Sequence, residues 1–120
     1  MNFEEWVNQI IETEKPSKKI KGYYFGLFET GDKEYMMYLS GSKEFDVDDD
    51  DWACNNDFEP KEKYLPLPQY KGFVWEDTLN QTIKTLQEFT TTDIYKNSFF
   101  VKAQGISTGF DGGDLVLIRQ

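Results

Sequence analysis

The sequence predicts an α+β domain in which a four-stranded, mostly antiparallel sheet packs with two main helices, in the order α-β-β-loop-α-β-β. Two segments show the apolar periodicity of an amphipathic helix, one at the N-terminus and one in residues 75–90. Two further segments, residues 20–40 and 97–119, hold strand-like runs joined by short turns. Strands that follow one another as hairpins, with helices elsewhere in the chain, are typical of this fold class. At 120 residues, the chain is expected to form a single domain, residues 1–120.

The first helix follows directly after Asn2. Its apolar residues recur with the i, i+3, i+4, i+7, i+8 spacing of one helix face, at Phe3, Trp6, Val7, Ile10 and Ile11. Asn2 can cap this helix, and Glu5, three residues later, completes a capping box. Pro16 ends the pattern, because the residue before a proline disfavours helical backbone.

A hairpin is predicted next, with strands at residues 20–29 and 34–40 and a turn at residues 30–33. The second strand alternates two sets of residues, one of which is Tyr35, Met37 and Leu39. In the first strand, Gly22 and Gly26 fall on one face. Small residues at these positions would let a helix approach the sheet closely.

A long connection, residues 41–70, separates the hairpin from the second helix. Connections of this length are uncommon within a domain unless they carry a function or are disordered. Aromatic residues are spread along this one, at Phe45, Trp52, Phe58, Tyr64 and Tyr70. Because such side chains can pin a segment to the core, we expect an ordered loop. Prolines favour an extended backbone in residues 63–68.

The second helix is predicted in residues 75–90, and residues 91–93 end it. A strand is expected within residues 97–108, after a short helical turn at residues 93–99. The last strand is predicted at residues 115–119.

A glycine-rich turn, residues 109–114, joins the last two strands. Glycine-rich loops can also hold phosphate, but such a loop normally leads into a helix. Here a strand follows and two aspartates flank the glycines, which favours a hairpin turn.

The residue types argue against catalysis. The chain has no histidine, which excludes Ser-His-Asp and Cys-His machinery and most zinc sites. Its single cysteine, Cys54, lies among acids and lacks the positive field that a reactive thiolate needs, so we expect an inert thiol. A carboxylate run in one loop lacks the two separate environments of a glycosidase pair. We therefore expect a protein that is not an enzyme.

The N-terminal segment lacks the basic region and long apolar run of a signal peptide. No apolar stretch approaches the roughly 20 residues of a membrane span. A single cysteine suits a reducing compartment. These features predict a cytoplasmic protein without a membrane partner.

The whole net charge of −9 can be assigned to residues 29–62. This stretch holds twelve acidic and three basic residues, whereas the rest of the chain balances to zero. At its centre, residues 46–52 read Asp-Val-Asp-Asp-Asp-Asp-Trp. Such a run repels itself and is disfavoured in helices and strands, so fold stability does not account for it. The charge disfavours a nucleic-acid partner and favours a basic protein or a cation.

The interpretation we favour is a surface for a basic protein, in which charge steers the encounter and aromatic side chains anchor it. The residues predicted to contact the partner are Asp46, Asp48, Asp49, Asp50, Asp51, Trp52, Asp57, Phe58 and Glu59. Trp52 has a second interpretation, as a side chain that fills the core beneath the loop. The plainer alternative for the run is a loop that serves solubility alone.

A cation- or small-ligand-binding module is another alternative. Asp46, Asp48 and Asp50 stand at positions 1, 3 and 5 of an EF-hand-like loop. Asp51 occupies the position that needs glycine, and Asp57 the position that usually holds glutamate. We therefore predict no metal ligand and no cofactor. A protein-interaction adaptor is a third option.

Four segments carry a resemblance: residues 38–45, Asp51-Trp52-Ala53-Cys54, Phe58-Glu59-Pro60 and residues 109–115. Together they resemble small acidic immunity proteins of bacterial polymorphic toxin systems. The resemblance covers residues 24–118 and implies a cytosolic α+β domain that binds and neutralises a cognate toxin domain, often a nuclease. A toxin that acts on nucleic acid is basic around its cleft, which agrees with an acidic inhibitor.

Overall fold

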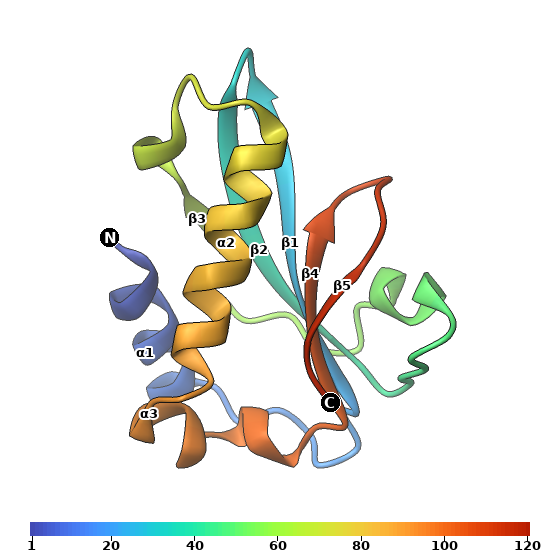
Figure 1. The fold of residues 1–120 in the computed structure, drawn as a ribbon. Helices are drawn as coiled ribbons and strands as arrows, with labels where there is room; N and C mark the ends of the chain where they lie inside the picture. Colours follow the sequence, from blue (N-terminus) through green and yellow to red (C-terminus); the bar gives the residue numbers. More distant parts are fainter.

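A computed structural model of the chain describes residues 1–120. Its five strands form one sheet in the order β3-β2-β1-β4-β5 (Figure 1). The strands are β1 (Gly22–Gly31), β2 (Glu34–Ser42), β3 (Tyr64–Pro66), β4 (Gly105–Phe110) and β5 (Val116–Arg119). β1 and β4 run parallel, whereas the other neighbouring pairs are antiparallel. The predicted α+β class is confirmed.

The predicted four-stranded, mostly antiparallel sheet is wrong in two respects. β3 is a fifth strand of three residues that ends in Pro66. A proline is tolerated there because β3 lies at the edge of the sheet, where one side of the strand has no pairing partner. The second difference is direction: β4 pairs with β1 in parallel. The chain returns to the sheet by way of α2 rather than by a tight turn, and a parallel neighbour requires a crossover of this kind.

The helices are α1 (Phe3–Thr13), α2 (Trp75–Phe89) and the four-residue α3 (Asp93–Lys96). The two main helices are confirmed as predicted, and α3 adds a third. The capping box at the start of α1 is present: Asn2 Oδ1 accepts the Glu5 backbone N–H at 2.9 Å, and the Glu5 carboxylate accepts the Asn2 N–H at 3.1 Å. No helix combines the length and the apolar character that a bilayer span requires.

Three short 3₁₀ helices complete the chain, η1 (Asp50–Cys54), η2 (Pro68–Tyr70) and η3 (Phe99–Lys102). η3 occupies four of the twelve residues, 97–108, in which a strand was predicted, so β4 begins only at Gly105. Ser98 explains this difference, because its hydroxyl accepts the Phe100 N–H at 3.2 Å and caps η3.

The main core lies between the sheet and the helices. Alternate residues of β1 point into it, namely Tyr23, Phe25 and Leu27, and they meet α1 and α2 side chains such as Trp6 and Leu86. Tyr35, Met37 and Leu39 of β2 lie in the same core, as their alternation predicted. Figure 1 shows α1 and α2 together on this side of the sheet.

The opposite face of the sheet carries a smaller cluster. Tyr24, Trp52 and Ala53 are buried there, packed with Tyr38, Phe45 and Leu115. The expectation that Gly22 and Gly26 would receive a helix is met only at Gly22, where the helix is the short 3₁₀ helix η1 that carries Trp52. The Trp52 ring covers Gly22 and the Tyr38 ring covers Gly26. The connection after β2, green in Figure 1, thus covers this face in place of an α-helix.

Candidate functional site

The acidic loop (residues 43–57) leaves β2 and returns beside the same strand. At its base, the Gly41 N–H donates to the Phe58 carbonyl at 2.9 Å, and the Gly41 carbonyl accepts the Phe58 N–H at 3.1 Å. The Asp57 carboxylate accepts the Lys43 N–H at 2.8 Å. These bonds join the two ends of the loop, so residues 43–57 form an ordered, closed segment within the predicted connection of residues 41–70.

Trp52 fixes the centre of the loop to the sheet. Its side chain is 5% exposed, and a Cβ added to Gly22 would lie 2.6 Å from its ring. Phe45 packs against Trp52 with 5.1 Å between ring centroids, and it covers Gly105 in the same way. Gly22 and Gly105 are direct partners across β1 and β4. Two neighbouring positions without side chains therefore provide the surface on which both rings rest.

Aspartates within the run organise the loop backbone. Asp46 Oδ1 accepts the Asp48 N–H at 2.8 Å. Asp49 caps η1 by accepting the Asp51 N–H at 2.9 Å. Asp50 Oδ2 accepts the Leu115 N–H at 3.3 Å and so ties the loop to the segment before β5. The loop keeps a defined backbone despite the mutual repulsion of its charges.

The aspartates of the run are all exposed, namely Asp46, Asp48, Asp49, Asp50 and Asp51. None of them forms an ion pair within the chain, since the two ion pairs are Lys63–Glu59 and Lys71–Glu34. The side chains of Asp48 and Asp51 also take no part in the hydrogen bonds of the loop, where only their backbone N–H groups donate. The loop thus presents carboxylates that no cationic side chain of the protein neutralises.

The other residues predicted to contact a partner occupy different settings. Phe58 is half-buried, and its ring lies edge-on to Tyr23 with 6.1 Å between centroids. Glu59 is exposed and pairs with Lys63 Nζ at 2.5 Å. Asp57 is exposed at the base of the loop. The structure therefore gathers the carboxylates on the loop surface and turns the Trp52 ring, with much of Phe58, toward the interior.

The candidate cation ligands of the loop do not converge. No group of three or more Cys, Asp or Glu side chains has the arrangement of a metal site. Asp46 and Asp50, which match EF-hand spacing, bond instead to the backbone of Asp48 and Leu115. Cys54 is a free, exposed thiol at the end of η1.

A pair of tyrosines beneath the loop was not predicted. The Tyr38 hydroxyl donates to Asp111 at 2.6 Å, and the Tyr24 hydroxyl donates to the Gly109 carbonyl at 2.9 Å. Burial raises the pKa of both hydroxyls above the ordinary tyrosine value, and the hydrogen bond to Asp111 raises that of Tyr38 further. Both tyrosines are therefore neutral donors that connect β1 and β2 to the glycine-rich turn. No local pattern predicts this pairing, because Tyr38 and Asp111 lie 73 residues apart.

A cavity of about 760 Å³ on the helix-covered face was also not predicted. It lies between α1 and α2, and its lining comes from α1, the η2 region, α2 and the start of α3. Periodicity within one helix cannot reveal a space that two distant helices enclose.

Comparison of the chain with models of known protein families, with curated proteins and with solved structures finds no match. The resemblance to immunity proteins therefore rests on the sequence motifs alone.

Proposed function

We propose that this protein binds a basic protein through the acidic loop and inhibits it, as an immunity protein that neutralises a cognate toxin. One observation carries the proposal: the exposed aspartates of residues 46–51 are held on a loop of defined backbone, and none has an ion-pair partner within the chain. Like charges held this close repel one another. This repulsion persists in the unbound protein, and a cationic partner surface would reduce it.

Support also comes from the way in which the loop is held. Trp52 seats its centre, the Asp57–Lys43 bond closes its base, and Asp50 ties it to Leu115. A loop whose backbone is already ordered loses less conformational entropy on binding than a flexible one. The carboxylates can then act together on a complementary surface, which raises the association rate and excludes partners of like charge.

The chemistry of the surface favours one class of basic partner. A protein that cuts or modifies nucleic acid lines its cleft with lysine and arginine to hold phosphates. The exposed carboxylates of residues 46–51 can occupy the places of those phosphates. Inhibition then requires no catalysis by this chain. In this account Trp52 positions the loop from beneath, because its buried ring is not available to a partner.

The test begins with a search of the reading frames beside this gene for a toxin-like domain, which is then purified and assayed with and without the immunity candidate. The informative variant is Asp48→Asn/Asp51→Asn, because neither side chain supports the loop backbone. It should weaken inhibition about tenfold through lost charge pairing, with an unchanged melting temperature.

The matched control is Glu12→Gln/Glu76→Gln, which removes the same charge from exposed positions on α1 and α2. This control should inhibit like the native chain. If both double variants inhibit equally well, the acidic loop is not the binding surface. If the native chain neither binds nor inhibits the toxin domain, the immunity function itself is wrong.

A further inference from the structure

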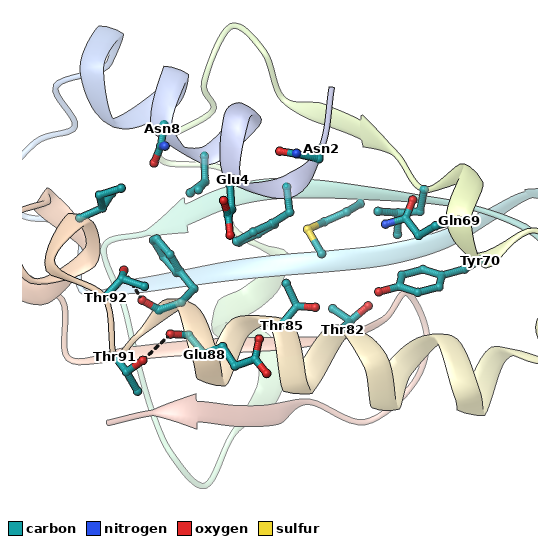
Figure 2. A pocket seen from close by; sticks show the side chains of 16 residues that line it. Asn2, Glu4, Asn8, Gln69, Tyr70, Thr82, Thr85, Glu88, Thr91 and Thr92 are labelled. Carbon is teal, nitrogen blue, oxygen red and sulfur yellow. Dashed lines mark hydrogen bonds between the residues drawn. The ribbon is translucent and has the colours of Figure 1, made fainter.

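The cavity between α1 and α2 is a groove on the face opposite to the acidic loop. Its volume of about 760 Å³ lies within the range of small-molecule sites, about 300 to 1,000 Å³. Figure 2 shows Glu4 from α1, and Thr82 and Thr85 from α2, pointing into the space between the two helices.

Thr82 gives the groove an unused hydrogen-bonding group. Its side chain is 1% exposed, and its hydroxyl has no hydrogen-bond partner. A helical threonine commonly donates to the carbonyl four residues earlier, as Thr78 does to Val74 at 3.4 Å. A buried hydroxyl without a partner is costly, so its place in the wall of a cavity indicates that a ligand completes it.

The charge of the lining selects the kind of ligand. Glu4 and Glu88 are its only charged residues, and no lysine or arginine contributes to it. Neither carboxylate forms an ion pair within the chain. The groove therefore offers two carboxylates to a cation and no cationic side chain to an anion.

The polar groups are also separated along the groove. Thr82 and Glu88 are six residues apart on α2, which corresponds to about 9 Å along the helix axis. Gln69 and Tyr70 lie toward the Thr82 end, and Glu4 and Glu88 toward the other, as Figure 2 shows. Phe3, Val7 and Phe89 contribute apolar surface to the lining. A ligand that matches the two carboxylates, the apolar surface and the Thr82 hydroxyl has an ammonium at one end, an apolar body and a hydroxyl or amide at the other end.

We propose that this groove binds a small organic amine of that kind, with its ammonium between Glu4 and Glu88 and its neutral polar group at Thr82. The site goes beyond the inhibitory function proposed above and does not depend on it, because the groove and the acidic loop lie on opposite faces of the sheet.

Three small molecules separate the contribution of the ligand's ammonium to binding from that of its hydroxyl. Tyramine carries the amine, the ring and a hydroxyl; phenethylamine lacks the hydroxyl; tyrosol replaces the amine with a neutral alcohol. Binding is followed by the backbone amide chemical shifts of the full chain. For a ligand of about ten heavy atoms, we expect tyramine to bind in the micromolar to millimolar range and to shift the amides of residues 82–88. Phenethylamine and tyrosol should each bind about tenfold more weakly.

Two variants assign these contributions to residues. Thr82→Val keeps the shape of the side chain and should abolish the advantage of tyramine over phenethylamine. Thr78→Val is its matched control, since Thr78 is equally buried on α2 but does not line the groove. Glu4→Gln/Glu88→Gln should weaken both amines about tenfold, whereas Asp48→Asn/Asp51→Asn should leave the groove shifts unchanged.

Four results would overturn the proposal. The first is the absence of chemical-shift changes in the groove at about 10 mM tyramine, a concentration above the dissociation constant expected for a ligand of its size. The second is shifts confined to the acidic loop, which would reveal only charge attraction. The third is a Thr82→Val variant that still prefers tyramine. The fourth is a groove that responds to the toxin domain but to no amine, which would make it a protein-docking surface.

Discussion

The Trp52 ring packs directly on the backbone of Gly22, so closely that a Cβ at Gly22 would lie 2.6 Å from the ring. The position of the acidic loop therefore depends on a missing side chain in β1. Because Gly22 also pairs with Gly105 beneath Phe45, the loop and the β1–β4 pair form one packing unit. This relationship connects the stability of the sheet to the presentation of the carboxylates.

Substitution of Gly22 with alanine should displace Trp52 and destabilise the protein by about 1 to 3 kcal/mol, the usual cost of overpacking. Chemical denaturation measures this loss, and amide exchange should show faster opening of residues 43–57. Gly31→Ala is the matched control, because a Cβ there meets only the flexible end of Glu34. Equal stability of the two variants would show that Trp52 does not depend on Gly22.

Substitution of Trp52 with alanine should lower the free energy of unfolding by about 3 to 5 kcal/mol, since it leaves a cavity above the sheet. Thermal unfolding measures the change. The stability of Trp52→Phe should lie between that of Trp52→Ala and that of the native chain. Weakened binding should follow from a disordered loop. Native stability combined with lost binding would instead assign Trp52 a direct contact with the partner.

The two main helices and the first hairpin were predictable because their signals are local. The spacing of Phe3, Trp6 and Ile10, the Asn2–Glu5 capping box, and the alternation through Tyr35 and Leu39 each lie within a few residues. Such patterns persist in the fold because they satisfy the backbone and bury one face of an element at the same time.

The parts that the sequence did not predict depend on contacts between distant residues. β3 has three residues and no pattern of its own, and it forms because Leu65 pairs with Met37 of β2. The parallel β1–β4 pairing and the contact of Trp52 with Gly22 likewise join segments far apart in the chain. The acidic run is evident in the sequence. Only the hydrogen bonds of the structure show which aspartates hold the loop backbone and which do not.

That division predicts opposite effects for two aspartates of the loop. Asp57→Ala removes the acceptor of the Lys43 N–H and should cost about 1 kcal/mol. Asp48→Asn removes a charge that makes no bond, so stability should stay the same or rise slightly through reduced repulsion. Urea denaturation of both variants checks this. A larger loss in Asp48→Asn than in Asp57→Ala would contradict the assigned roles.

Alkaline pH should destabilise the protein through its buried tyrosines. Burial raises the pKa of Tyr23, Tyr24 and Tyr38 in the folded state. Above about pH 10 the unfolded chain loses these protons first, so stability is retained below that pH and falls as pH rises, by up to about 1.4 kcal/mol per pH unit for each tyrosine.

Urea unfolding across this pH range tests the expectation. Tyr23→Phe should make the decline shallower, because it removes one of the tyrosines whose pKa burial raises. The exposed Tyr64 provides the control, and Tyr64→Phe should leave the decline unchanged. A decline that is the same in all three proteins would argue against the role of Tyr23.

Thr82→Val should raise the stability of the unliganded protein by about 1 kcal/mol or more, because it removes a buried hydroxyl that has no partner. Thr78→Val should instead be neutral or destabilising, since it loses the hydrogen bond to Val74. Thermal unfolding of both variants measures the difference. A destabilised Thr82→Val variant would mean that the hydroxyl is satisfied in solution by another route.

The most direct test of the central claim is the rate at which this protein associates with a toxin domain found in a neighbouring reading frame, measured by stopped flow at increasing salt. The native chain should associate fastest at low salt and lose at least about tenfold in rate as screening increases. Asp48→Asn/Asp51→Asn should associate more slowly at low salt and with a flatter salt dependence, while Glu12→Gln/Glu76→Gln should follow the native chain. Identical rates and salt dependence for all three proteins would contradict the claim that the acidic loop recognises a basic partner.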